Sequence, residues 1–409
     1  MSSSFIFSPL ESFASNLINK LNFFDKLYKK SYLRECKKSK STDEIYILKA
    51  LPFDSLDLIK VSDVSRCFRF DIPEEYRAQL NNYKFFSNDS ESVNNDSVNN
   101  YNVIENFIKN NYSSFDIDTH QLIEQHIKET AKHFLTDLKK GKSKSNNTIL
   151  GVHSIVYNQN KELKLEMFIT DYFTYNCIIG IYKELYKLNK KPFIVDSLDK
   201  LINIYPFVCC CGIGGFLNLQ YKGLLPINST MSRPFSSTIS GTLIAKRSNV
   251  AACPNHWHCS FDETFDIRDK ATSVQGDKPS LKMCLTRGLY EELGINYIPK
   301  KHNIKNLMLF LIVNNNRLEA EFFTEIVIPI NSYYDLRDYI SRFQCASDAE
   351  NENSHLLLVP TENVFTYLTN KKENNEHITP EALYFAKVYN KINNNKLLTI
   401  LYKLKQLSL

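Results

Sequence analysis

The strongest periodic pattern in the chain lies between Pro279 and Leu293. Four leucines recur four residues apart and mark one face of a helix: Leu281, Leu285, Leu289 and Leu293. Proline is tolerated in a first helical turn, and Gly294 predicts a left-handed end, because glycine adopts positive φ without a steric penalty. The pattern therefore predicts a helix with a buried leucine face. It places the adjacent carboxylates Glu291 and Glu292 on the other side, pointing away from the core.

Two other helices are predicted by similar spacing in the first half of the chain. The first starts at Ser8, where Ser-Pro-Leu-Glu is a capping pattern, and runs into the lysine-rich stretch 29–40. A basic amphipathic helix can lie on a membrane surface, but acidic residues interrupt this one, and packing against the core is favoured. The second helix runs from Asp118 to Lys140 and is closed by Gly141.

Apolar runs between and after these helices predict strands. Four segments have the composition of strands: 150–157, 163–170, 307–313 and 321–330. A helix through Ile178 to Leu188 is predicted after the first two strands. A last helix is predicted from Thr379 to Asn393, because Pro380 suits the first helical position. This mixture of strands and helices predicts a fold of the α/β (α+β) class.

Composition narrows the functional classes. The 409 residues exceed what one hydrophobic core usually serves, and a hydrophobic content of 43% is enough for globular cores. The 50 basic and 45 acidic residues nearly balance, so no strong signal for nucleic acid arises, although a local basic patch would suit a small anionic ligand. Neither a secretory signal nor an apolar run near 18 residues is found, so no membrane span is expected. Ten cysteines are then typical of reduced thiols in a cytoplasmic protein.

The segment 287–295, Arg-Gly-Leu-Tyr-Glu-Glu-Leu-Gly-Ile, resembles the second half of the Nudix box, whose pattern there is Arg-Glu-aliphatic-x-Glu-Glu-x-Gly-aliphatic. Six positions match: Arg287, Leu289, Glu291, Glu292, Gly294 and Ile295. The departure is Gly288, where the family has a glutamate that binds metal or assists catalysis. The first half of the box does not match, because Ser273 and Pro279 stand at its glycine and glutamate positions.

The resemblance implies a C-terminal Nudix-like α/β/α sandwich, and the strand at 240–248 and the tryptophan at 257 stand in the expected order before the box. Residues 86–102 are polar and low in complexity, which is typical of a linker or a long surface loop. Four regions are therefore expected: a mostly helical N-terminal module at 1–85, a polar linker at 86–110, an α/β extension at 111–205 and the Nudix-like domain at 206–398.

The activity implied by the resemblance is hydrolysis of a nucleoside diphosphate linked to another group, or of a related diphosphate. Such a reaction needs charge neutralisation on the diphosphate and a water molecule in line with the P–O bond, and Mg²⁺ or Mn²⁺ held by carboxylates supplies both. In this interpretation Glu291 and Glu292 hold the metal, Glu292 also taking part in catalysis. Glu263 supplies a third carboxylate or a general base, and Arg287 orients Glu291 by an i,i+4 ion pair.

Two basic residues, Lys246 and Arg247, are the candidates for binding the anionic substrate. Because Gly288 lacks the usual carboxylate, an alternative remains open: a Nudix-like module that senses a nucleotide or nucleotide-sugar without cleaving it, or that scaffolds a protein partner, a role the N-terminal module could also have. A glycine at this place is explained most simply if a ligand or a neighbouring strand approaches it. Three glutamates that alternation would put on one face of a later strand could replace the missing group: Glu319, Glu321 and Glu325.

Two cysteine-containing segments could indicate other kinds of site, a dinucleotide-binding loop and a zinc site. The run 209–215, Cys-Cys-Cys-Gly-Ile-Gly-Gly, lacks the helix that a dinucleotide-binding loop needs, so close backbone packing is favoured. The segment from Cys253 to Cys259 contains two histidines, but no second ligand pair accompanies it, so a zinc site is disfavoured.

Overall fold

The computed structural model describes residues 45–51, 55–85, 97–142, 145–222, 238–248, 253–271, 278–299, 301–346 and 353–393. The helix expected from Ser8 and the lysine-rich stretch after it lie outside these residues. Within the described ranges, no helix combines the length and apolar character needed to cross a membrane.

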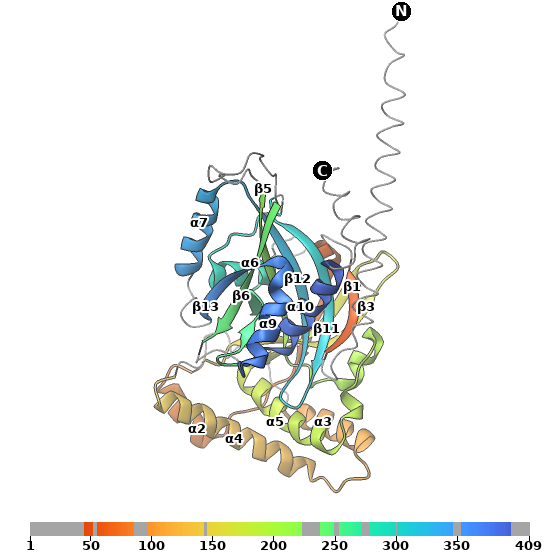
Figure 1. Ribbon diagram of the computed structural model, residues 1–409. Helices are drawn as coiled ribbons and strands as arrows, with labels where there is room; N and C mark the ends of the chain where they lie inside the picture. The colour runs from red at the N-terminus through yellow and green to blue at the C-terminus, as the bar shows by residue number, and fades with distance from the viewer. Residues whose placement is uncertain are drawn as a thin grey trace, which may run out of the picture.

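An eight-stranded mixed sheet forms the centre of the molecule (Figure 1). Its main path follows the order β1 (Ile45–Leu51), β11 (Asn303–Val313), β12 (Leu318–Ile330), β5 (Cys211–Lys222), β6 (Thr238–Arg247) and β13 (Asn353–Pro360). The pairing of β12 with β5 is parallel, and the other pairings on this path are antiparallel. Strand β1 lies beside β11 although more than 250 residues separate them in the sequence, so residues 45–51 belong to the same sheet as the C-terminal strands.

The sheet divides along β5. The first half of β5, at 212–215, pairs with β8 (Phe261–Thr264), and its second half, at 217–222, pairs with β6. A short strand, β7 (Trp257–His258), pairs with the end of β6. Ser260 lies at the division, where its hydroxyl accepts a hydrogen bond from the Leu217 amide at 2.7 Å. Strands β6 and β8 therefore lie end to end along β5, each paired with a different half of it.

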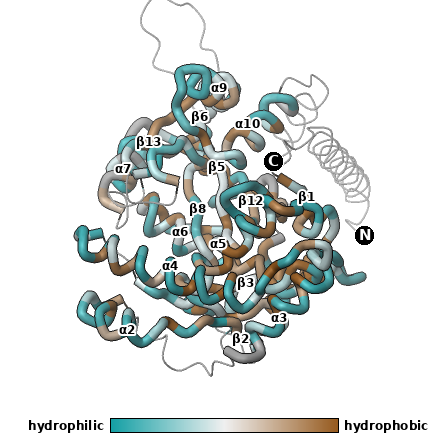
Figure 2. Tube along the Cα trace, turned by 90° about the horizontal axis from the view of Figure 1, so that it is seen from below, coloured by the Kyte–Doolittle hydropathy of each residue, from teal (hydrophilic) through white to brown (hydrophobic). Residues whose placement is uncertain are grey.

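A second, three-stranded sheet has the order β2 (Ile59–Cys67), β4 (Leu163–Asp171) and β3 (Thr148–Tyr157). The predicted hairpin is confirmed by the antiparallel pairing of β3 with β4. Four helices gather below the large sheet in Figure 1: α2 (Glu74–Asn81), α3 (Ser97–Asn111), α4 (Thr119–Lys139) and α5 (Tyr172–Leu188). Helix α4 is the one predicted from its apolar stripe, with Asp118 as N-cap, and its two-sided character is visible along the tube in Figure 2.

Helices cover both faces of the large sheet. Helices α6 (Leu281–Leu293) and α7 (Tyr333–Gln344) contact one another on one side, while α9 (Val364–Glu373) and α10 (Pro380–Asn393) lie on the other side, in front of the strands in Figure 1. Neighbouring residues on β12 show the two faces: Phe322 joins the core that includes α6, and Phe323 stacks on Phe385 of α10 with ring centroids 3.6 Å apart. The predicted α/β (α+β) class is confirmed, with helix, sheet and helix in three layers.

Short elements complete the described chain: the 3₁₀ helices η1 (Ser55–Leu58), η2 (Lys191–Phe193), η3 (Leu198–Ile204) and η4 (Thr361–Asn363), and the two-stranded pair β9 (Lys270–Ala271) and β10 (Lys278–Pro279). Pro279 therefore lies in β10, just before α6, and not in the first helical turn as predicted. Ser280 occupies the N-cap position instead.

The second half of the expected polar linker, residues 97–110, is part of helix α3. Its Ile104, Phe107 and Ile108 are buried in the same core as α6. The helical spacing of these three residues is hidden in the sequence by the asparagines around them. That larger core contains side chains from Leu51 to Phe343.

Candidate functional site

Helix α6 has the ends and the buried face that its sequence predicts. Gly294 adopts a φ of +64°, and the Ile295 amide donates to the Leu289 carbonyl at 2.9 Å, which closes the helix in a left-handed cap. The four leucines of the predicted face are buried. Glu291 has a side chain that is 35% exposed, whereas Glu292 is 3% exposed. The prediction that both carboxylates point away from the core is therefore wrong for Glu292, which is enclosed by β8 and the end of β6.

A cavity of about 760 Å³ lies beside α6, and we call it the α6 cavity. Its charged lining residues are Arg247, Asp262, Glu263, Asp266, Arg268, Arg287, Glu291, Glu292, Arg317, Glu319 and Glu321. Its uncharged lining residues include Ile149 of β3 and Tyr172, Tyr175, Asn176 and Ile179 of α5. Of the six residues predicted from the sequence, the structure brings five into this cavity: Arg247, Glu263, Arg287, Glu291 and Glu292.

Lys246 is the predicted site residue that the structure places elsewhere. Its ammonium group lies 3.1 Å from the Glu376 carboxylate and 5.7 Å from the centre of the Trp257 ring. The physical reason is strand alternation: neighbouring residues on β6 point to opposite faces, so Arg247 and Lys246 cannot both reach the cavity.

Gly288 is explained by the close approach of Glu263. A Cβ atom built on residue 288 would lie 2.6 Å from the Cβ of Glu263, a distance that real Cβ atoms essentially never show. Strand β8 therefore packs against α6 at a point where only glycine fits. The approach brings a carboxylate from β8 to the helical position at which the Nudix pattern has its own glutamate.

Arg287 holds this corner together. Its guanidinium binds Asp269 through two hydrogen bonds of 2.8 and 3.0 Å, and it donates to the Thr264 carbonyl at 2.8 Å. The remaining nitrogen, Nη1, lies 2.7 Å from Glu263 and 3.3 Å from Glu291. The predicted i,i+4 ion pair with Glu291 is present, but it is the longest of these contacts. Arg287 thus fixes two carboxylates from different elements in one geometry.

The environment of Glu263 favours its protonated form. Burial has the largest influence and raises the pKa of Glu263 to about 8; Arg287 opposes the rise, while the charges of Glu291 and Asp269 add to it. A carboxyl group with a pKa close to neutral pH can both release and accept a proton under physiological conditions.

Glu292 is connected to a buried histidine through β8. Its Oε1 accepts a hydrogen bond from the Asp262 amide at 2.9 Å, and its Oε2 lies 3.8 Å from Arg247. The side chain of Asp262 lies 3.4 Å from Nε2 of His258, which also lies 3.0 Å from Glu381 of α10. Burial disfavours a charge on His258, but the hydrogen bonds to these two carboxylates raise its pKa to about 9.

Arg317 extends the polar contacts to α5. It lies 3.1 Å from Glu319 and binds Glu381, and Glu319 accepts a hydrogen bond from the hydroxyl of Tyr175. Burial and the charges of neighbouring carboxylates raise the pKa of Glu321 well above its usual range. Two of the three candidate replacement glutamates, 319 and 321, thus line the cavity, whereas Glu325 binds Asn218 at 2.6 Å and does not line it.

The donor atoms around the α6 cavity are of the kind that Mg²⁺ and Mn²⁺ prefer, because carboxylate oxygens are hard ligands. Their positions do not match a metal centre as they stand. Among the described residues, no group of three or more His, Cys, Asp or Glu side chains is placed to hold a metal ion.

Several residues of this cavity were not predicted. Asp262, Arg268 and Arg317 line it, and Asp269 binds Arg287, yet no pattern in the sequence links these four residues to α6. Two of the contacts that join separate elements around the cavity, Arg287–Asp269 and His258–Glu381, span 18 and 123 positions along the chain. The cysteine and glycine run behaves as predicted, because it opens β5, and a Cβ on Gly215 would collide with the backbone of Thr324 on the parallel neighbour β12.

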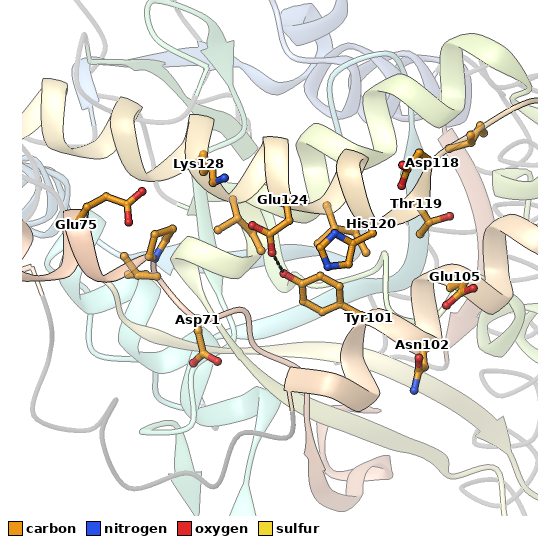
Figure 3. Close-up of a pocket in the computed structure, with 15 residues that line it drawn as sticks. Asp71, Glu75, Tyr101, Asn102, Glu105, Asp118, Thr119, His120, Glu124 and Lys128 are labelled. Atoms are coloured by element: carbon orange, nitrogen blue, oxygen red, sulfur yellow. Dashed lines mark hydrogen bonds between the residues drawn. The ribbon is translucent and has the colours of Figure 1, made fainter.

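A second cavity, of about 970 Å³, lies beside the start of α4, and we call it the α4 cavity (Figure 3). Acidic side chains also gather there: Asp71, Glu75, Glu105, Asp118 and Glu124. The Tyr101 hydroxyl donates to Glu124 at 2.6 Å, the contact drawn in Figure 3. None of the residues predicted from the sequence lines it.

Comparisons with known proteins add little. No family model matches the chain, and a search of curated proteins found no match. A solved structure, the crystal structure of C. elegans Ap4A hydrolase, is similar at 10% sequence identity over 41% of this chain and 91% of that chain, with a TM-score of 0.22. A likeness at that TM-score identifies neither fold nor activity.

Proposed function

We propose that the α6 cavity is the catalytic site of a Nudix-like hydrolase that cleaves a nucleoside diphosphate-linked substrate or a related diphosphate. One observation carries the proposal. Glu263 packs onto Gly288 and brings a carboxylate to the place where the Nudix pattern has a glutamate, beside Glu291 and Glu292. The departure from the pattern at residue 288 is thereby compensated by a residue of another element.

In this proposal Glu263 takes the proton from the attacking water molecule, since its raised pKa lies close to neutral pH. Arg287 positions Glu263 and does not contact substrate, because Asp269 and Thr264 occupy its other nitrogens. Arg247 and Arg268 line the cavity and would compensate the negative charge of the phosphates.

Glu291 and Glu292 are the residues that would hold Mg²⁺ or Mn²⁺. A bound ion would neutralise phosphate charge. The steps given to the side chains do not depend on it, since the carboxylates are not arranged around an ion in this structure.

The alternative is a module that binds the same ligands without cleaving them. The contacts of Arg287 with Glu263 and of Arg247 with Glu292 favour this alternative. Each of these carboxylates already has a cation beside it and so has less need of a metal ion. The two functions share a pocket and differ in whether a product forms.

The deciding experiment uses the full chain and a panel of nucleoside diphosphate sugars and dinucleoside polyphosphates, with Mg²⁺, with Mn²⁺ and with a chelator. Products are identified by mass spectrometry, and binding is followed by thermal shift. Hydrolysis that Glu263→Gln and Glu292→Gln abolish supports the enzyme, provided that Glu105→Gln in the α4 cavity has no effect. A raised melting temperature without product supports the binding module. Neither product nor binding for any compound contradicts both.

A further inference from the structure

The lining of the α6 cavity is chemically divided between two parts of the chain. Its charged side chains all come from the C-terminal half, in or next to β6, β8, α6 and β12. The lining residues of the preceding region, on α5, on β3 or just before β3, are all uncharged: Ser145, Asn147, Ile149, Tyr172, Tyr175, Asn176 and Ile179. We call the four residues of α5 in this set, from Tyr172 to Ile179, the α5 wall. A single cavity therefore combines a charged part with an aromatic and amide-bearing part.

The aromatic rings of the α5 wall belong to an ordered stack. Tyr172 lies on the fully buried Phe134 with centroids 5.8 Å apart and planes inclined by 12°. Tyr175 follows Tyr172 with centroids 6.0 Å apart and planes inclined by 25°. The stack thus begins in the core at α4 and reaches the cavity at two rings of α5.

Polar contacts fix the orientation of this wall. The hydroxyl of Tyr175 donates to Glu319, which Arg317 holds at 3.1 Å, so the ring cannot turn freely. The side-chain amide nitrogen of Asn176 donates to the Tyr172 carbonyl at 2.7 Å. That bond fixes the orientation of the Asn176 side-chain amide in the cavity lining. A preorganised aromatic surface loses little conformational entropy when a flat ligand binds.

We infer that the α5 wall binds the planar base of a nucleotide ligand, while the charged part of the same cavity holds its diphosphate. The inference rests on the proposed function and adds to it the nucleoside end of the substrate. Aromatic side chains stack on any nucleobase, because every base has a π-face. A cavity of about 760 Å³ is within the range of sites that enclose small-molecule ligands.

This assignment also gives α5 a role in selecting the substrate. A diphosphate without a base would contact only the charged part, whereas a nucleoside diphosphate would contact both parts. Tyr175 is then a specificity-determining residue, and its hydroxyl serves to hold the ring. The ring and the hydroxyl can be separated by substitution, since phenylalanine keeps one and removes the other.

The test measures binding of ADP, UDP and inorganic pyrophosphate to the full chain by calorimetry. Wild type should bind both nucleotides at least about tenfold more tightly than pyrophosphate, as stacking on one base implies. Tyr175→Leu should remove about tenfold of ADP affinity and leave pyrophosphate unchanged, and Tyr172→Leu should act in the same direction. Tyr175→Phe should keep ADP affinity within about threefold of wild type, because the ring remains.

A measurement on the unsubstituted chain avoids any effect of the variants on folding. With tyrosine rings isotopically labelled, nuclear Overhauser contacts are expected between the adenine protons of ADP and tyrosine ring protons, and Tyr175→Phe should remove some of them. Equal affinities of wild type for ADP and pyrophosphate, or the absence of these contacts for bound ADP, overturns base recognition and leaves the proposed function intact. Loss of pyrophosphate affinity equal to that of ADP in Tyr175→Leu assigns the ring a structural role and also overturns it. If neither ADP nor pyrophosphate binds and no substrate is cleaved, the proposed function itself fails.

Discussion

Acidic side chains line both the α6 cavity and the α4 cavity, but their negative charges are stabilised in different ways. In the α6 cavity, Glu292 and Glu321 are almost fully buried, and arginines or a histidine from other elements lie against the neighbouring carboxylates. In the α4 cavity, Asp71, Glu75 and Glu105 are exposed to solvent. Asp118 there caps its own helix by accepting from the Gln121 amide at 2.9 Å.

This difference separates a functional candidate from an ordinary acidic surface. Water stabilises an exposed carboxylate at almost no cost in folding free energy. A group of carboxylates on a surface is therefore weak evidence for a functional site. Burying a carboxylate is costly unless it is paired, so a buried and paired set persists only where the fold supplies partners. The α4 cavity, although larger, is therefore the weaker candidate for a functional site, and we assign the proposed function to the α6 cavity.

The strongest test of this comparison is Arg287→Met. We expect a loss of roughly 3–5 kcal/mol in the free energy of unfolding, because Asp269 and Glu263 would stay buried without their cation. Urea denaturation measures the loss. Lys128→Met in the α4 cavity is the matched control and should stay within about 0.5 kcal/mol of wild type. A loss below about 1 kcal/mol for Arg287→Met would show that Arg287 does not hold the cavity together.

Gly288→Ala tests the approach of β8 to α6. Alanine is the better helix former by roughly 0.5–1 kcal/mol, so helix propensity alone predicts stabilisation. We expect instead a net loss of about 1–3 kcal/mol, because the new Cβ collides with Glu263. The double variant Gly288→Ala with Glu263→Gly should recover part of that loss in the same denaturation assay. A Gly288→Ala protein more stable than wild type would contradict the close packing.

The pH dependence of catalysis tests the role given to Glu263. A general base with a pKa of about 8 is active only when deprotonated, so kcat/KM should rise about tenfold per pH unit below that value and level off above it. Steady-state rates between pH 6 and 9 measure the profile. His258→Gln serves as a control that removes the nearby group with a pKa of about 9. A profile that is flat across this range would assign the base to another residue.

The pH dependence of stability gives a smaller effect that needs no substrate. The pKa of Glu263 is raised from 4.5 in the unfolded chain to about 8 in the fold, so between these values the folded protein binds the extra proton. The stabilisation is complete below pH 4.5 and is lost as pH rises through about 8. Glu263→Gln should therefore flatten the decline of unfolding free energy over this window. An unchanged decline in the variant would show that other groups cause it.

The smallest effect is expected in the α4 cavity. Glu124→Gln keeps an acceptor for the Tyr101 hydroxyl and should change stability by less than about 1 kcal/mol, with no change in ligand binding. Thermal shift with and without ADP measures both quantities. A loss of ADP binding in this variant would reverse the ranking of the two cavities.

The elements that could be predicted were those with a local period. Helix α4, with Asp118 before it, and the hairpin of β3 and β4 follow from spacing that a short window contains. Helix α3 was not predicted, because the asparagine-rich composition of the segment concealed the helical spacing of Ile104, Phe107 and Ile108. The tertiary context decided that this segment is a helix, since its apolar residues complete a core that other helices begin.

The same distinction applies to the site. The sequence by itself determined that α6 exists, that Gly294 ends it, and that Glu291 and Glu292 are adjacent on it, because 3.6 residues per turn fix these relations within one helix. The tertiary structure alone decided that Glu263 meets Gly288 and that Arg287 binds Asp269. These contacts join separate elements whose relative placement depends on packing, and no spacing along the chain encodes them.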